Sequence, residues 1–177
     1  MIIGVDFFRG AKAEEHEEIE SLLLAAFGRP DEATLVRQLR ADGDMWAEVV
    51  APWQGVVAGY AALSRMRAPD DWACLAPVAV VPRLQRGAAA RKPGHGHGFN
   101  IGTRMVNMLT YIVGTRAGTF PHTIVVVGKP SFYERAGFSL GRAQQLSSPY
   151  PLSQTLIARR GDDIPEEELV YPRAFGI

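Results

Sequence analysis

The spacing of apolar residues predicts two helices near the start of the chain. Apolar side chains recur at helical intervals over 19–27, and glutamates crowd the first turns of this segment. A second helix is expected over 31–40, separated from the first by the helix-breaking residues 28–30. Residues 1–8 alternate loosely in apolar and β-prone residues, which predicts an opening strand.

From residue 45 the apolar period changes to two. This pattern predicts a β-hairpin with strands at 45–51 and 56–66 and a turn at 52–55. In the turn, Gly55 allows backbone angles that other residues avoid. Segment 74–81 is almost wholly apolar, as in a central strand that is buried on both faces.

Helices and strands alternate in the second half of the chain. A helix is expected from Ile101 to about Gly114, and a short helix over 131–136. Strands are expected at three places, namely 123–127, from Phe138 onward, and 155–160. The pattern predicts an α/β or α+β fold with a mixed sheet of about seven strands flanked by about four helices.

Composition narrows the function classes. The 177 residues fit a single domain over 1–177, and 19 basic residues balance 19 acidic ones. This neutrality argues against nucleic acid or an anionic membrane as the main partner. No apolar run approaches the ~18 residues of a membrane span. The single cysteine, Cys74, cannot form an internal disulfide, so we expect a cytoplasmic protein.

The most informative element is the succession of strand 74–81, a glycine-rich loop and the helix that begins at Ile101. Free backbone N–H groups at a helix start suit an anion such as phosphate. Five basic residues and no acidic one lie between Arg83 and Arg104, which creates a local positive field. A solvated surface loop is the alternative explanation. The glycines fit neither the dinucleotide fingerprint nor the P-loop spacing.

Two ordered motifs connect this element to a known family. The first comprises Val80-Val81-Pro82-Arg83-Leu84-Gln85 and, further on, His97-Gly98-Phe99-Asn100-Ile101-Gly102. The second is Phe132-Tyr133-Glu134-Arg135-Ala136-Gly137-Phe138, directly after an apolar strand. In this order the motifs resemble those of the GNAT superfamily of acyl-CoA-dependent N-acyltransferases, and the flanks resemble a bacterial subgroup of predicted N-acetyltransferases.

The resemblance implies a mostly antiparallel GNAT-like sheet and the direct transfer of an acetyl group from acetyl-CoA (CoA) to an amine, without a metal. The amine would belong to a small molecule or a protein. A backbone N–H near Val80 would stabilise the charge that develops on the thioester oxygen, and Tyr133 would be the general acid for the CoA thiolate. The expected cofactor-binding residues are Val78, Val80, Arg86, Gly98, Asn100, Ile101, Gly102, Thr103 and Ser131.

The glycine-rich loop departs from the family pattern. We expect a loop insertion at about 86–97, because Pro93 and the glycines after it prevent the contiguous helix that the motif would need. Asn100 stands at the first motif glycine and tolerates positive φ better than most residues. An alternative function is therefore a catalytically impaired acyl-CoA-binding or interaction module on the same fold.

Other candidate chemistry is less specific. Glu32, Asp70 and Asp71 are candidates for the general base, with a water chain as the alternative. His95 and His97 lack a third ligand nearby, so no metal site is expected. Cys74 is expected to be a buried apolar residue. The oligomeric state is open, and the hairpin tryptophans are the candidates for a homodimer surface: Trp46, Trp53 and Trp72.

Overall fold

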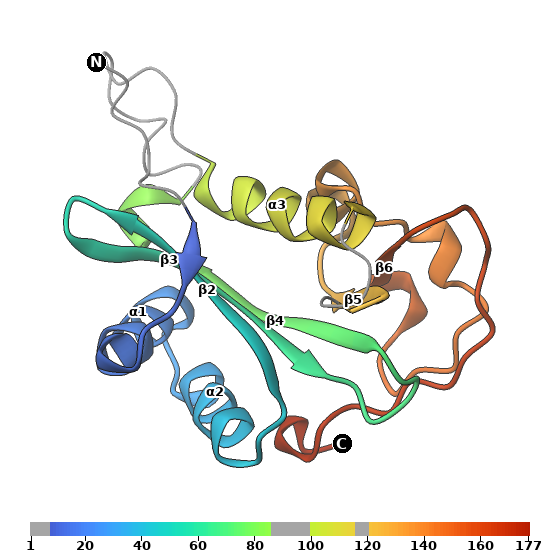
Figure 1. Cartoon of the computed structure of the whole chain (residues 1–177), viewed down its shortest axis with the longest axis horizontal. Helices are drawn as coiled ribbons and strands as arrows, with labels where there is room; N and C mark the ends of the chain where they lie inside the picture. The colour runs from blue at the N-terminus through green and yellow to red at the C-terminus, as the bar shows by residue number, and fades with distance from the viewer. Residues whose placement is uncertain (1–7, 86–99, 116–120) are drawn as a thin grey trace.

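The computed structural model describes residues 8–85, 100–115 and 121–177, which form a six-stranded sheet with helices on both faces (Figure 1). The strands are adjacent in chain order, and every pair is antiparallel except β4 and β5. Their bounds are β1 Arg9–Gly10, β2 Met45–Trp53, β3 Val56–Arg65, β4 Trp72–Val80, β5 Thr123–Val127 and β6 Thr155–Arg159. The expected mixed, mostly antiparallel sheet is confirmed.

The four expected helices are also present. Helices α1 (His16–Phe27) and α2 (Asp31–Ala41) cover one face of the sheet, and α3 (Ile101–Thr115) covers the other (Figure 1). The short α4 (Pro130–Tyr133) follows β5 and continues as a 3-10 turn. None of the helices in the described ranges is long and apolar enough to cross a membrane.

The sheet has six strands where about seven were expected. The strand predicted from Phe138 does not form, because only Ser139 pairs, in an isolated bridge to Ile157, before the chain enters a 3-10 turn at Gly141–Ala143. Most of the predicted opening strand lies outside the described residues, which begin at Phe8 just before β1.

The β2–β3 hairpin is tighter than the sequence suggested. β2 continues to Trp53, so only Gln54 and Gly55 form the turn. Both residues have positive φ, 50° and 79° respectively. This is the backbone that a two-residue hairpin requires, because its twist matches that of the flanking strands.

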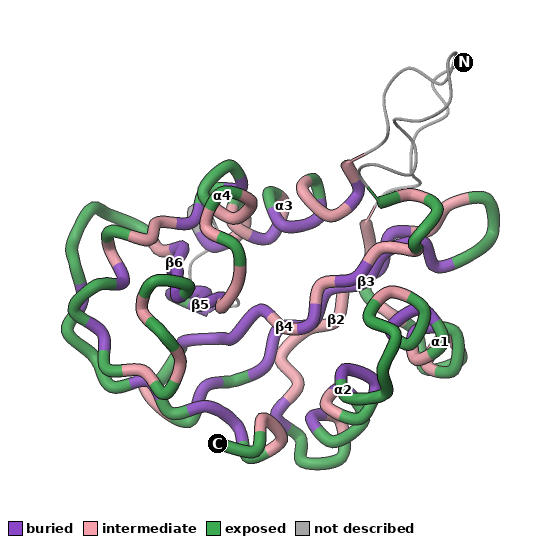
Figure 2. The backbone as a smooth tube through the Cα atoms, turned by 180° about the vertical axis from the view of Figure 1, so that it is seen from behind, coloured by how far each residue is buried: buried purple, intermediate pink, exposed green. Residues whose placement is uncertain are grey.

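Side chains alternate between the two faces of the central strands. On β3, Tyr60 and Ala62 pack toward α1, whereas Ala61 and Leu63 pack toward α3. Figure 2 shows that both the central strands and the inner sides of the helices are buried. The sheet therefore separates two apolar layers, each closed by its own helices.

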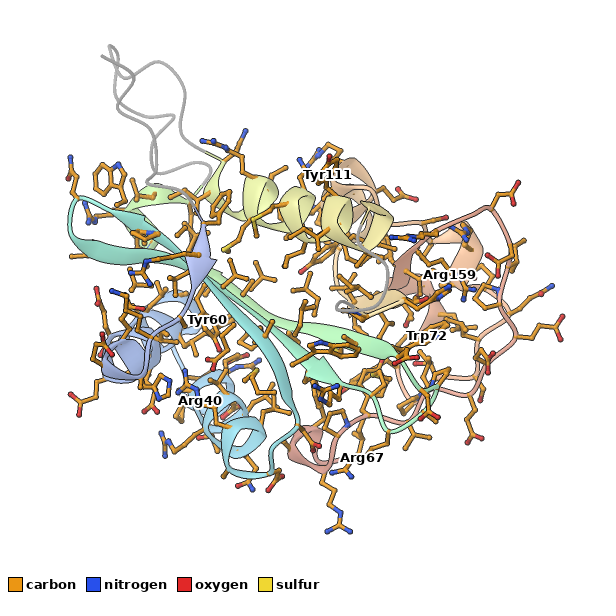
Figure 3. The ribbon with its side chains drawn as sticks, viewed as in Figure 1. Arg40, Tyr60, Arg67, Trp72, Tyr111 and Arg159 are labelled. Carbon is orange, nitrogen blue, oxygen red and sulfur yellow. The ribbon has the colours of Figure 1, made fainter. Side chains whose placement is uncertain are left out.

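A buried polar network fastens α2 to the sheet. The hydroxyl of Tyr60, which is fully buried, donates to Glu48 over 2.6 Å, and the Arg40 guanidinium donates to the same carboxylate over 2.7 Å. Figure 3 shows Arg40 and Tyr60 approaching each other between α2 and the sheet. Each of the three polar side chains in this network has a partner, so the network fixes α2 without leaving an unpaired charge.

A glycine on β3 sets how closely α3 approaches the sheet. A Cβ atom at Gly59 would stand 2.7 Å from Cγ2 of Ile101 and 3.2 Å from Cβ of Ala51. These distances are shorter than van der Waals contact, so the first turn of α3 depends on the missing side chain.

We expect Gly59→Ala to lower the free energy of unfolding by about 1–3 kcal/mol, because the added methyl group overpacks the contact with Ile101. Urea unfolding followed by circular dichroism measures the change. Gly10→Ala is the matched control in β1, since the nearest atom to its Cβ would be 4.0 Å away. Equal stability of the two variants would show that α3 adjusts freely.

Candidate functional site

Strands β4 and β5 pair only at their beginnings. Their register joins Trp72 with Thr123 and ends at Cys74 with Val125, although β4 continues to Val80. Beyond Cys74, β4 has no partner on this side within the described ranges. The two strands therefore enclose a wedge that opens toward their carboxyl ends.

Backbone groups of β4 that have no strand partner among the described residues point into the wedge. The Val81 N–H donates to the Ala58 carbonyl on β3 over 2.9 Å. Because backbone direction alternates along an antiparallel pair, the N–H and C=O groups of Val80 and Val78 face away from β3. The Gln85 side-chain amide donates to the Val80 carbonyl over 2.9 Å, which agrees with this direction.

A cavity of about 230 Å³ lies at the mouth of the wedge, between the end of β4, the start of α3, and α4. Seven of the ten sequence-predicted site residues line it, namely Val78, Val80, Asn100, Ile101, Gly102, Thr103 and Tyr133. Ser131 is exposed on α4 and does not line the cavity. Arg86 and Gly98 lie outside the described residues.

Three further lining residues were not among the predicted site residues: Leu84, Gln85 and Phe132. Leu84 and Gln85 belong to the first motif, and Phe132 opens the second. Their place in the motifs was the available signal, but a motif does not show which of its side chains face a cavity.

The start of α3 places backbone N–H groups at this cavity that have no acceptor among the described residues. The first hydrogen bond there joins the Arg104 N–H to the Asn100 carbonyl over 2.9 Å, so the N–H groups of Ile101, Gly102 and Thr103 precede the intrahelical ladder. Asn100 has a φ of 29°, as its position in the motif led us to expect. The helix dipole adds positive potential at the same place.

Two arginines supply further positive charge near the cavity. The Arg83 guanidinium lies 4.8 Å from the centre of the Trp53 ring, and that of Arg104 lies 6.0 Å from the centre of the Phe8 ring. Neither has a carboxylate partner among the described residues. Both remain available to a negatively charged group.

Tyr133 is held by aromatic neighbours beside the wedge. Its ring lies edge-on to Phe132 at 4.9 Å and to Phe138 at 5.6 Å. Burial raises the pKa of Tyr133 to about 12, and the nearby Cys74 thiol adds to the rise. The hydroxyl therefore keeps its proton at neutral pH, which is the state that a proton donor requires.

Cys74 marks the apex of the wedge, because it is the last residue of β4 that pairs with β5. Its side chain is buried, and burial raises the pKa of the thiol to about 12. A thiol with such a pKa is protonated at neutral pH and is a poor nucleophile. Cys74 is thus the buried apolar residue that the sequence predicted.

The structure does not bring the three candidate bases to this cavity. Glu32 is 9% exposed and pairs with Arg29 over 2.5 Å. Asp70 and Asp71 are exposed in the turn before β4, at the strand end opposite the mouth of the wedge. All three side chains are absent from the described lining of the cavity.

Two other predictions concern residues away from the wedge. Within the described ranges, no cluster of three or more His, Cys, Asp or Glu side chains could hold a metal ion, while His95 and His97 lie outside those ranges. Trp72 is 4% exposed and contributes no homodimer surface, whereas Trp46 and Trp53 are partly buried. The homodimer stays a prediction.

Comparison with known proteins agrees with the fold and the motifs. No family model matches the sequence. The Escherichia coli K12 protein named uncharacterized N-acetyltransferase YhbS is 28% identical over 151 residues, which cover 82% of this chain and 81% of that protein.

Two solved structures share the whole architecture. The CoA complex of the GNAT family N-acetyltransferase YhbS from Escherichia coli superposes with a TM-score of 0.76 at 24% identity, covering 98% of this chain and 93% of the other. The acetyl-CoA complex of a GNAT family acetyltransferase from Brucella melitensis gives a TM-score of 0.68 at 26% identity, covering 96% and 97%. The chain is therefore similar to GNAT family acetyltransferases in its ordered motifs, its diverging β4 and β5 and its overall fold.

Proposed function

We propose that this chain is an acetyl-CoA-dependent N-acetyltransferase that transfers an acetyl group directly to a primary amine of a small molecule or a protein. The observation that carries the proposal is the 230 Å³ cavity. The backbone N–H groups at the start of α3, the backbone groups of β4 that have no strand partner, and the side chain of Tyr133 meet there. The related GNAT structures bound to CoA and acetyl-CoA support the same choice of cofactor. A cytoplasmic location belongs to the proposal and rests on the single, buried cysteine.

The residues around the cavity fit the chemical parts of CoA. The N–H groups of Ile101, Gly102 and Thr103 suit a pyrophosphate, with Arg83 and Arg104 close enough to add positive field. The backbone groups of Val78 and the Val80 carbonyl, which also accepts from Gln85, can pair with the amides of an extended pantetheine arm, as an added strand would. The Val80 N–H then stays available for the acetyl group. Gly102 leaves room beside Val80, whose Cγ2 atom would lie 3.5 Å from an added Cβ.

The same residues can carry out direct transfer. Bound acetyl-CoA supplies an acetyl group activated as a thioester. The Val80 N–H donates to the acetyl oxygen while that oxygen gains negative charge during attack by the amine. As the C–S bond breaks, the Tyr133 hydroxyl gives its proton to the departing sulfur. The nitrogen loses a proton as the new C–N bond becomes an amide, and that proton restores the Tyr133 hydroxyl, whose raised pKa keeps it protonated between turnovers.

The first prediction concerns binding of the cofactor. Isothermal titration should detect CoA and acetyl-CoA binding, and Gly102→Val should weaken it about tenfold or more, because a branched side chain would intrude where the α3 N–H groups are exposed. Gly10→Val, on β1 away from the cavity, should bind as the unmodified chain does. Absence of binding at millimolar CoA would overturn the proposed function, and binding without turnover of any amine would favour the interaction module.

Tyr133→Phe separates binding from turnover. The ring and its packing remain, so the affinity for acetyl-CoA should stay nearly unchanged, while kcat falls about 100-fold through loss of the proton donor. The loss should shrink with an acyl donor whose thiolate is a weaker base. Tyr111→Phe, 70% exposed on α3, is the matched control. Unchanged kcat under conditions where chemistry limits the rate would refute the assignment of Tyr133.

Gly128→Ala tests the position of the same ring without removing its hydroxyl. The new Cβ would stand 2.5 Å from Cε2 of Tyr133, so the ring must move. We expect kcat to fall at least tenfold with little change in acetyl-CoA affinity, since misplacement of a reacting group is costly. Gly141→Ala, whose Cβ would have no neighbour closer than 4.0 Å, should keep full activity. Steady-state kinetics with thiol detection measures both.

A further inference from the structure

The chain carries a primary amine of its own at the mouth of the wedge. The sequence contains three lysines, at positions 12, 92 and 129, of which position 92 lies outside the described residues. Lys129 follows two residues after the end of β5 and is the N-cap of α4, the helix that carries Tyr133. Its side chain is exposed and forms no ion pair within the described ranges. No described carboxylate therefore holds this amine.

The register of the sheet places Lys129 opposite the cofactor-binding part of β4. Cys74 pairs with Val125 at the apex of the wedge, so the same offset carried beyond this pair matches Val78 with Lys129. Val78 lines the 230 Å³ cavity. The two residues stand at the same level on opposite arms of the wedge, so a chain inserted between the arms runs past both.

Local contacts fix Lys129 next to Tyr133. The Lys129 carbonyl accepts the Tyr133 N–H over 3.3 Å, and a Cβ atom on the preceding Gly128 would stand 2.5 Å from Cε2 of the Tyr133 ring. The backbone of Lys129 is extended, and successive side chains of an extended chain point to opposite sides. Since Gly128 faces the Tyr133 ring, the Lys129 side chain leaves the backbone on the other side, which explains why it does not line the cavity.

The Lys129 side chain is long enough to reach a thioester in the wedge. With bonds of about 1.5 Å, a lysine side chain spans about 6 Å from Cα to Nζ, whereas neighbouring strands lie about 4.8 Å apart. A pantetheine arm that runs along β4 takes the place of the missing strand, so its thioester lies beside the end of β5. Tyr133 approaches the thioester from one side, and Lys129 can approach it from the other.

We propose that the chain acetylates its own Lys129 from acetyl-CoA bound in the same wedge, an inference that rests on the proposed function. The neutral Nζ amine, whose ammonium proton has passed to water, attacks the thioester carbon. A C–N bond forms and the C–S bond breaks. Tyr133 gives its proton to the departing sulfur and recovers one from the attacking nitrogen. The products are CoA and an uncharged acetyl-lysine, so each chain reacts once at this position.

Peptide mass spectrometry after incubation of the full chain with acetyl-CoA measures acetylation at each lysine. Lys12 is the matched internal control, because it is also exposed but lies in the segment that leads into α1, beside the Glu15 carboxylate. Its slow acetylation reports the reaction of acetyl-CoA with any exposed amine. We expect Lys129 to react at least tenfold faster than Lys12, because it is held close to the thioester. Equal rates at the two lysines would overturn the proposal.

Two variants test the origin of the acetyl-lysine. Tyr133→Phe should lower the rate at Lys129 to that at Lys12 and leave the rate at Lys12 unchanged, because only the enzymatic reaction uses the proton donor. Lys129→Arg keeps the positive charge and should remove the fast addition of one acetyl group from the intact mass. A rate at Lys129 that Tyr133→Phe does not alter, or fast addition that persists in Lys129→Arg, would refute self-acetylation at this residue.

Dilution tests whether the transfer stays within one chain. At saturating acetyl-CoA, the rate constant for Lys129 should not change when the chain is diluted tenfold. A rate constant that falls in proportion to the dilution would show transfer between chains and overturn the placement of Lys129 at its own wedge.

Cofactor binding and an external amine separate this inference from the proposed function. If isothermal titration detects no binding of acetyl-CoA, both fail. If acetyl-CoA binds and an external amine is acetylated while Lys129 reacts no faster than Lys12, the proposed function stands and self-acetylation fails.

Discussion

The early separation of β4 from β5 is the constraint on which the site depends. Opposite Ala76 and Pro77 of β4, strand β3 contributes only Ala62, because its register shifts between Ala61 and Leu63. Proline has no N–H to give a neighbouring strand, and two residues against one form a bulge that bends the strand. The bend comes directly after the last paired residues, so β4 turns away from β5 where both would otherwise have continued side by side.

This separation leaves polar backbone groups exposed within an apolar part of the fold. A ligand that runs along β4 can satisfy them, whereas a continuous sheet would have no room for one. The position of α3 follows from the same region, because Gly59 allows Ile101 to lie against β3 and thereby sets the helix start beside the end of β4. Donor groups from the strand and from the helix then reach one cavity because of two local features, a proline and a glycine.

Local sequence signals predicted most of the elements, but only part of their arrangement. Apolar periodicity located the helices and the central strands, since each buries one face or both against the core. The strand expected from Phe138 failed because its apolar start is followed at once by a 3-10 turn at Gly141–Ala143. Of the site, seven of the ten predicted residues line the cavity, but the motif residues Leu84, Gln85 and Phe132 were missed. Ser131, which directly precedes the second motif, is exposed on α4.

Contacts between distant segments could not be predicted in this way. The C-terminal Val170 bridges to Ala68 before β4, and Glu168 bridges to Ser147. These pairings depend on tertiary packing, and no periodic pattern in either segment indicates its partner. They matter because they close the sheet face opposite α3, where Tyr171 packs with Cys74. The α3 face of the wedge thus carries the 230 Å³ cavity, whereas the opposite face is closed by segments that come from distant parts of the chain.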